Sequence, residues 1–181
     1  MKYCNISLIG FMASGKSTVG KLIADKTQMV FIDTDRVIEL KQDMSVADIF
    51  KNFGEIYFRD QETEVIAKLG DNKSCVFACG GGVVERGENI RVLKKNSLVV
   101  YLKVSPLKVL ERTEGASGRP LLDVPAKKQK IMDLMQRRGQ AYRSSADMVI
   151  DTDIYEPYQI ADIIISIFEK NEKNNCQDFK S

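Results

Sequence analysis

The stretch IGFMASGKST, residues 9–18, decides the fold of this chain. It follows an apolar run, YCNISLI at 3–9, and precedes a segment of helical character, STVGKLIADK at 17–26. The pattern G-x-x-x-x-G-K-[ST] between a strand and a helix is typical of a phosphate-binding loop. The alternative is an ordinary glycine-rich turn.

This loop predicts a nucleotide site made of consecutive residues. Its backbone N–H groups and the positive end of the following helix would face phosphate oxygens, while Lys16 bridges the outer phosphates and Ser17 reaches Mg²⁺. Lys16 would also act in catalysis. We therefore expect the nucleotide to contact Gly10, Ala13, Ser14, Gly15, Lys16, Ser17 and Thr18.

Five apolar runs alternate with helical segments along the rest of the chain. The runs occupy 3–9, 29–33, 74–79, 97–104 and 147–152. Such alternation predicts a five-stranded parallel sheet with helices on both faces. Capping residues indicate two of the helices: Ser45 starts one that Gly54 ends, and Ser105 starts another with Pro106 in its first turn.

Length and composition favour one globular domain over 1–181, with a polar tail from about residue 169. Of 181 residues, 44% are hydrophobic, and the formal net charge of +2 gives no reason to expect nucleic acid or a membrane as partner. No signal sequence or membrane span is evident, so we expect a cytoplasmic protein and a monomer. The four cysteines are expected to be reduced and mostly buried in strands.

A pair of aspartates follows the second run, in VFIDTD at 30–35. If the strand continued through them, its alternation would put Asp33 and Asp35 on one side, roughly 6 to 7 Å apart. Carboxyl ends of parallel strands face ligands, so one aspartate would serve a metal and the other a substrate hydroxyl. The alternative for one of them is to cap the next helix.

Three glycines, Gly80, Gly81 and Gly82, follow the third run in ACGGGVV at 78–84. Their entropic cost makes sense where the backbone needs unusual dihedral angles or close approach, so we expect a ligand against them. A plain turn is the alternative.

Two arginines are hard to explain as solvent-facing. Arg138 falls within the apolar stripe of the helix predicted over 126–143, and Arg59 borders the apolar face of another. A buried guanidinium needs an anion, which is either an internal carboxylate or the carboxylate of a ligand. Near Arg59 in sequence stands Glu62, whereas no carboxylate competes locally for Arg138.

The region from Lys108 to Arg143 is basic, with nine Lys or Arg against four Asp or Glu. Within it, TEGASGRPLLDVP at 113–125 is rich in glycine and proline and is interpreted as a mobile loop, the alternative being a solvated loop without a function. Its Arg119 would neutralise charge during phosphoryl transfer. Because the chain has no histidine, Asp35 is the best-placed proton acceptor.

With these motifs placed, the chain resembles the shikimate kinase family over nearly its whole length. The matching stretches occur in that family's order: GFMASGKST (10–18), DTD (33–35), FRDQE (58–62), ACGGGVV (78–84), SGRPLL (117–122) and RRGQAYRSSAD (137–147). The resemblance implies a three-layer α/β/α P-loop kinase fold of the nucleoside monophosphate kinase type. It implies transfer of the γ-phosphoryl group of ATP to the 3-hydroxyl of shikimate, on the route to chorismate and aromatic amino acids.

The resemblance also implies roles for single residues. Asp33 would stand on the metal side, Asp35 would bind the accepting hydroxyls, Arg59 and Arg138 would hold the carboxylate, and Gly80 to Gly82 would face the substrate. A lid at about 114–125 would bring Arg119 to the phosphates, and Arg112 and Pro157 would flank the adenine. Ala13 departs from the family, which usually has glycine there, and its methyl group bears on the conformation of the loop.

Two other functions are alternatives to shikimate phosphorylation. A gluconate kinase shares the phosphate loop and a small hydroxylated acid as acceptor, but the GGG and FRDQE stretches argue against it. A non-catalytic nucleotide-dependent switch is the more distant alternative, and DNKSC at 71–75 lacks the aspartate of a guanine-binding N-K-x-D pattern.

Overall fold

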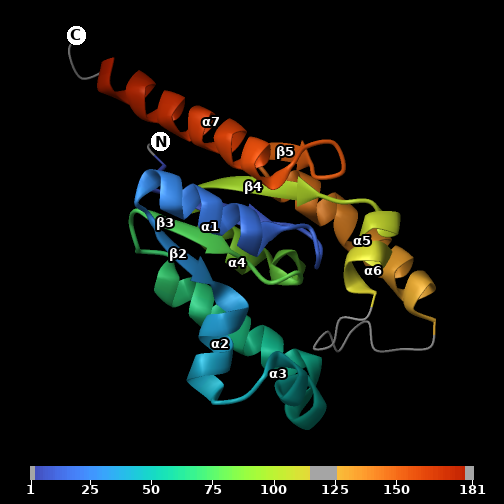
Figure 1. Ribbon diagram of the computed structural model, residues 1–181. Coiled ribbons are helices and arrows are strands. Elements are labelled where there is room, and N and C mark those ends of the chain that lie inside the picture. The colour runs from blue at the N-terminus through green and yellow to red at the C-terminus, as the bar shows by residue number, and fades with distance from the viewer. Residues whose placement is uncertain (1–2, 115–125, 178–181) are drawn as a thin grey trace.

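The structure, a computed structural model, describes residues 3–114 and 126–177, and its centre is a five-stranded sheet (Figure 1). The strands are β1 (Asn5–Ile9), β2 (Val30–Asp33), β3 (Cys75–Ala78), β4 (Ser97–Lys103) and β5 (Met148–Asp151). Their order is β2-β3-β1-β4-β5, and every neighbouring pair is parallel. Each of the five apolar runs forms a strand, as predicted.

Helices cover both faces of this sheet. On one face lie α1 (Lys16–Thr27) and α7 (Pro157–Gln177), which pack against each other (Figure 1). The other face is covered by α3 (Val46–Leu69), α4 (Gly87–Asn96), α5 (Pro106–Thr113) and α6 (Lys127–Ser145). The short helix α2 (Thr34–Gln42) packs on α3, and a 3₁₀ turn, η1 (Val83–Glu85), precedes α4. The three-layer α/β/α fold is therefore confirmed.

Alternation along the strands explains why two cores form. Along β4, Leu98, Val100 and Leu102 point into the core beneath α1 and α7. Val99 and Tyr101 point into the opposite core beneath α4 and α6. Successive side chains of a strand face opposite sides, so a strand covered on both faces must be apolar throughout.

The carboxyl ends of the strands meet at one edge of the sheet. Because β1 lies in the middle, the loop that follows it is flanked by the ends of β3 and β4. Ligands of open α/β sheets bind at this edge. The strand order thus brings the phosphate loop between the aspartates that follow β2 and the segment that follows β5.

The predicted helix starts are confirmed, and so is the end predicted at Gly54. Ser45 accepts a hydrogen bond from the backbone N–H of Asp48, and Ser105 accepts one from that of Lys108. Gly54 has non-helical dihedral angles, φ 82° and ψ 176°, so the label α3 covers two helices that meet at a kink there. Glycine adopts a positive φ without the steric cost that other residues have.

The tail and the cysteines differ in part from expectation. The polar segment predicted as a tail from about residue 169 is helical as far as Gln177. Cys75 and Cys79 are buried free thiols at β3, whereas Cys4 precedes β1 and is partly exposed. Within residues 3–114 and 126–177, no helix has the length and apolarity needed to cross a membrane.

Candidate active site

The phosphate loop adopts the conformation that its motif predicts. Gly15, at φ 89°, is the residue before α1, and Ala13 also has a positive φ of 61°. Alanine therefore takes up the left-handed conformation that glycine would adopt more easily. The Lys16 ammonium donates to the carbonyl oxygens of Gly10 and Phe11, each at 2.9 Å, which holds it against the loop.

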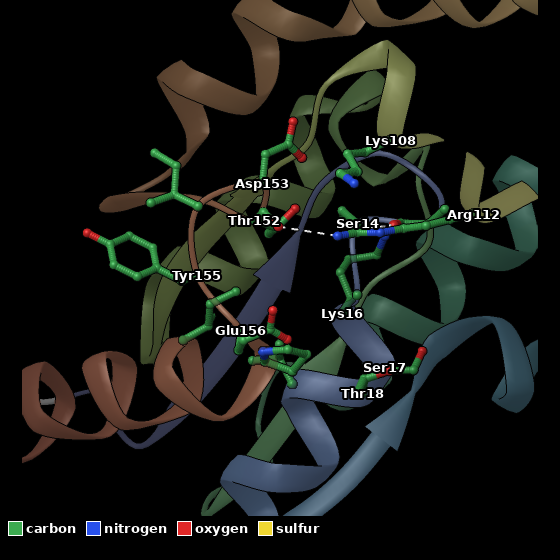
Figure 2. A pocket seen from close by; sticks show the side chains of 16 residues that line it. Ser14, Lys16, Ser17, Thr18, Lys108, Arg112, Thr152, Asp153, Tyr155 and Glu156 are labelled. Carbon is green, nitrogen blue, oxygen red and sulfur yellow. Dashed lines mark hydrogen bonds between the residues drawn. The ribbon is translucent and has the colours of Figure 1, made fainter. Parts of the chain in front are cut away.

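One side of the loop opens into a cavity of about 540 Å³, which we call the nucleotide cavity (Figure 2). Of the predicted nucleotide-binding residues that the structure describes, all but Gly10 line it: Ala13, Ser14, Gly15, Lys16, Ser17, Thr18, Arg112 and Pro157. Gly10 lies just before these residues, at the start of the loop.

Arg112 connects the phosphate loop to the segment that follows β5. Its guanidinium donates to the carbonyl oxygen of Ala13 at 3.0 Å and to that of Thr152 at 3.2 Å (Figure 2). Arg112 lies in the last turn of α5, and Pro157 begins α7 after the β5 strand. Folding therefore brings to the loop the two residues assigned to the adenine by resemblance alone.

The two carboxylate oxygens of Asp33 make different contacts. Its Oδ2 accepts a hydrogen bond from the Ser17 hydroxyl at 2.8 Å. Its Oδ1 caps α2 by accepting from the backbone N–H groups of Asp35 and Arg36. The capping alternative is thus confirmed for Asp33, while its second oxygen stays beside Ser17.

The predicted geometry of the Asp33 and Asp35 pair is wrong. β2 ends at Asp33, and Asp35 lies in the first turn of α2, so strand alternation does not relate them. The cap at Asp33 turns the chain into the helix directly after the strand. Both side chains nevertheless line one cavity, because the first turn of α2 stands at the carboxyl edge of the sheet.

This second cavity, of about 840 Å³, is called the acceptor cavity. It shares Ala13, Lys16 and Ser17 with the nucleotide cavity, so the two meet at the phosphate loop. Charged side chains and two of the three predicted glycines face it: Asp33, Asp35, Arg59, Arg138, Gly81 and Gly82.

The glycine turn after β3 is explained by close approach rather than by unusual dihedral angles. A β-carbon on Gly80 would lie 2.5 Å from both Asp35 Oδ1 and Glu62 Oε1, and one on Gly82 would lie 2.1 Å from Arg59 Cζ. None of the three glycines has a positive φ. Gly80 is therefore required for packing charged groups together, whereas Gly81 and Gly82 also line the acceptor cavity.

Both predicted arginines are buried, and both have internal carboxylate partners. Arg59 contacts Glu62 at 2.9 Å, Glu55 at 3.1 Å and Glu85 at 3.3 Å. Arg138 contacts Glu85 at 3.0 Å and lies 3.8 Å from Glu55. The internal ion pair left open by the sequence is thus confirmed. No carboxylate lies near Arg138 in sequence, but folding brings Glu85 to it from 53 residues away.

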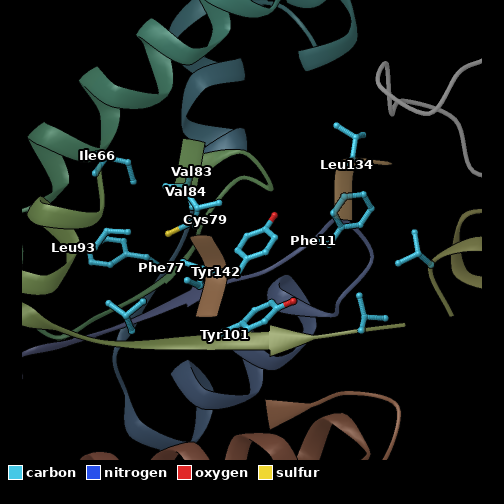
Figure 3. Close-up of a cluster of buried hydrophobic side chains, with 14 of the residues drawn as sticks. Phe11, Ile66, Phe77, Cys79, Val83, Val84, Leu93, Tyr101, Leu134 and Tyr142 are labelled. Atoms are coloured by element: carbon cyan, nitrogen blue, oxygen red, sulfur yellow. The ribbon is translucent and has the colours of Figure 1, made fainter. Parts of the chain in front are cut away.

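The apolar side of α6, which carries Arg138, is fixed against the sheet and the glycine turn. Tyr142, one turn further along, is buried and stacks on Tyr101 of β4, with 4.9 Å between the ring centroids (Figure 3). The Tyr142 hydroxyl donates to the carbonyl oxygen of Gly81, which also accepts from Arg138 Nη1 at 3.2 Å. This contact fixes α6, and with it the guanidinium, against the glycine turn.

Two buried carboxyl groups have strongly perturbed acidity. Burial, reinforced by the charge of Asp33, raises the pKa of Asp35 to about 6, and Lys16 opposes the shift. Burial raises the pKa of Glu62 to about 7, although Arg59 favours its ionised form. Among the described residues, no group hydrogen-bonds to Asp35 Oδ1 or Glu62 Oε1. A carboxyl group of this kind binds a proton near neutral pH.

Sequence reasoning missed two residues and could not place another. Glu55 and Glu85 contact both arginines, and the signal that could have found them is the need of any buried guanidinium for an anion. Arg119 and the lid predicted at about 114–125, apart from Glu114, lie outside the described residues.

Comparisons with known proteins identify the family. The family model described as Shikimate kinase matches residues 12–169. A shikimate kinase of Thermodesulfovibrio yellowstonii is 43% identical over 92% of this chain and 95% of its own. A structure of shikimate kinase from Acinetobacter baumannii in complex with shikimate superposes with a TM-score of 0.89 at 36% identity, covering 93% of this chain and 94% of the other.

A gluconokinase structure from Sinorhizobium meliloti also superposes, with a TM-score of 0.58 at 14% identity over 98% of this chain and 99% of the other. At that identity the likeness reflects the shared fold alone. It therefore gives the gluconate alternative no support beyond the phosphate loop.

Proposed function

This chain belongs to the shikimate kinase family, and we propose that it transfers the γ-phosphoryl group of ATP to the 3-hydroxyl of shikimate, giving shikimate 3-phosphate and ADP. One observation carries the proposal beyond family membership. The cavity that faces two buried arginines opens onto the same loop residues, Ala13, Lys16 and Ser17, as the nucleotide cavity. A small acid held by the arginines would thus lie beside the phosphates.

The nucleotide half would bind ATP mainly through backbone groups. The N–H groups of residues 13–18 point to phosphate oxygens in loops of this kind, at the positive end of the α1 dipole. The Lys16 ammonium, now on the carbonyl oxygens of Gly10 and Phe11, would turn to the outer phosphates. Arg112 and Pro157 also line this cavity, which supports their assignment to the adenine.

The acceptor half would bind and activate the hydroxyl. In the transfer, the acceptor oxygen forms a bond to the γ-phosphorus, the bond from that phosphorus to the β,γ-bridging oxygen breaks, and ADP leaves. Asp35 would take the hydroxyl proton, because its pKa of about 6 leaves it mostly ionised at neutral pH yet more basic than an ordinary aspartate. The carboxylate of shikimate would pair with Arg59 and Arg138.

The residues at the junction of the two cavities fit Mg²⁺. A hydroxyl and a carboxylate oxygen, Ser17 Oγ and Asp33 Oδ2, lie 2.8 Å apart. Mg²⁺ prefers oxygen ligands and takes few from the protein, keeping water and substrate phosphates for the rest. Accordingly, the described residues hold no cluster of three or more acidic, cysteine or histidine side chains. When bound, the ion would neutralise phosphate charge.

The wider expectations remain predictions. A monomer acting in the cytoplasm on small molecules, without nucleic acid or membrane partners, agrees with the formal net charge of +2. Closure of a lid over 114–125 that carries Arg119 to the phosphates would exclude water from the reaction.

The test is the release of ADP from Mg-ATP with shikimate, quinate and gluconate offered separately. We expect turnover that saturates with shikimate and little with the other two acids. Equal turnover with gluconate, or ATP hydrolysis indifferent to every acid, would contradict the proposal.

A further inference from the structure

Glu85 joins the two arginines of the acceptor cavity from the last position of η1, three residues after the glycine turn. Its Oε1 accepts a hydrogen bond from Arg138 Nε at 3.0 Å, and its Oε2 lies 3.3 Å from Arg59 Nε. Oε1 also accepts from Arg137, whose side chain is 60% exposed. A single carboxylate therefore links α3 to α6 through both guanidinium groups.

These contacts leave one terminal nitrogen of Arg138 without a hydrogen bond. Arg138 Nη1 donates to the Gly81 carbonyl, whereas Arg138 Nη2, which lies 3.8 Å from Glu55 Oε1, is buried with no hydrogen-bond partner among the described residues. Both arginines line the acceptor cavity, whereas Glu85 is not among the residues that do. Glu85 thus contacts the pair from behind, by their Nε atoms.

Charge explains why such a group is needed. Two guanidinium groups that converge on one cavity repel each other, and an anion between them offsets the repulsion. Burial alone would raise the pKa of Glu85, but the hydrogen bond from Arg138 and the charges of Arg138, Arg59 and Arg137 lower it below its ordinary value. Glu85 is therefore an anion at neutral pH.

We infer that Glu85 is a positioning residue for acceptor binding, which fixes the Arg59 and Arg138 guanidinium groups at the acceptor cavity so that Arg138 Nη2 can meet the carboxylate of the acid beside the charge of Arg59. The inference rests on the proposed function. An opposite role, in which Glu85 competes with the acid for the arginines, would require it to face the cavity. Its place behind the arginines favours positioning.

The test compares Glu85→Ala and Glu85→Gln with the wild type, using shikimate and its neutral carboxamide analogue. Glu85→Ala should raise the KM for shikimate about tenfold, because a misplaced clamp loses binding geometry, while the KM for ATP stays unchanged. The preference for the acid over the amide should fall in parallel. Glu85→Gln has one acceptor oxygen and can serve one arginine, so it should lie between Glu85→Ala and the wild type.

Arg137→Ala is the matched control, because it removes the exposed partner of Glu85 and does not touch the acceptor cavity. It should change the KM for shikimate less than about twofold. Three results would overturn the inference: an unchanged KM in both Glu85 variants, a lowered KM, or a raised KM with the acid-over-amide preference intact. If the wild type itself does not phosphorylate shikimate, the proposed function fails instead.

Discussion

The nucleotide cavity and the acceptor cavity meet at the phosphate loop, but they are built in different ways. The first is lined by one continuous stretch, residues 13–18, together with Arg112 and the start of α7. The second collects charged side chains from the end of β2, α2, α3 and α6 around a glycine turn. Phosphates need backbone donors, which one turn supplies, whereas a small acid needs side chains that only folding can assemble.

The two cavities also differ in how their cationic side chains are stabilised. At the loop, the Lys16 ammonium lies on carbonyl oxygens and is partly exposed. In the acceptor half, two buried arginines meet three carboxylates, Glu55, Glu62 and Glu85. Variants in the first half should therefore change catalysis with little effect on folding, whereas variants in the second should change acid binding and stability together.

The largest effect is expected from Lys16→Ala. Removing a charge that stabilises the transferring phosphoryl group should lower kcat by on the order of 10²–10³-fold. Because the Lys16 ammonium donates to carbonyl oxygens of its own loop, at Gly10 and Phe11, the thermal midpoint should barely move. Steady-state kinetics at saturating Mg-ATP with a melting curve measure both; near-normal kcat would refute the assignment.

At the junction of the two halves, Asp35→Asn and Asp33→Asn should fail differently. Asp35→Asn removes the proton acceptor and should lower kcat by on the order of 10²-fold. Asp33→Asn alters the carboxylate beside Ser17 and should shift the Mg²⁺ requirement. The check is a Mg²⁺ titration of each variant. Identical titration curves for both variants and the wild type would contradict this division of roles.

In the acceptor half, Arg138→Ala should raise the KM for shikimate by roughly 30-fold, since truncating one partner of a desolvated charge pair costs about 2 to 5 kcal/mol. The KM for ATP should hardly change. Arg138→Lys should rescue only partly, because a point charge cannot make a two-pronged contact.

The neutral carboxamide analogue of shikimate supplies the control for Arg138. The wild type should bind it more weakly than the acid, and Arg138→Ala should discriminate little between the two. If the variant keeps the full preference of the wild type, the carboxylate is bound elsewhere, and the two halves would not divide the ligands as described.

The smallest effect concerns stability against pH, and Glu62→Gln should reveal it. The pKa of Glu62 rises from 4.5 to about 7 on folding, so its contribution to stability is present below about pH 4.5 and is lost as pH rises through about 7. Glutamine does not ionise, so the Glu62→Gln variant does not lose stability in this way as the pH rises. Its thermal midpoint relative to the wild type should therefore increase by about 3 °C or more between pH 5 and pH 8.

Glu64→Gln, on the same helix, is the control for that experiment. Hydrogen bonds from Lys41 and Lys68 lower the pKa of Glu64 to about 2, so its titration lies below this pH range. The difference in midpoint between Glu64→Gln and the wild type should stay constant from pH 5 to pH 8. Parallel curves for Glu62→Gln and the wild type would show that Glu62 does not take up a proton there.

Much of the fold followed from local patterns. The five apolar runs, the loop at 9–18 and the helix starts at Ser45 and Ser105 were predicted because each depends on residues that are close in sequence. One error, Asp35 as a strand residue, concerns how the chain continues after a break. An aspartate cap permits a turn, but packing decides whether a helix begins there.

By itself, the sequence determined the type of sheet, the phosphate loop, the presence of two inward arginines and the glycine turn, because period and motif are local properties of the chain. Only the tertiary structure decided which carboxylates those arginines meet, that Gly80 and Gly82 make room for charged groups, and that Asp33 both caps α2 and bonds to Ser17. These contacts join residues far apart in sequence, and the energy of a buried charge depends on every group that folding places around it.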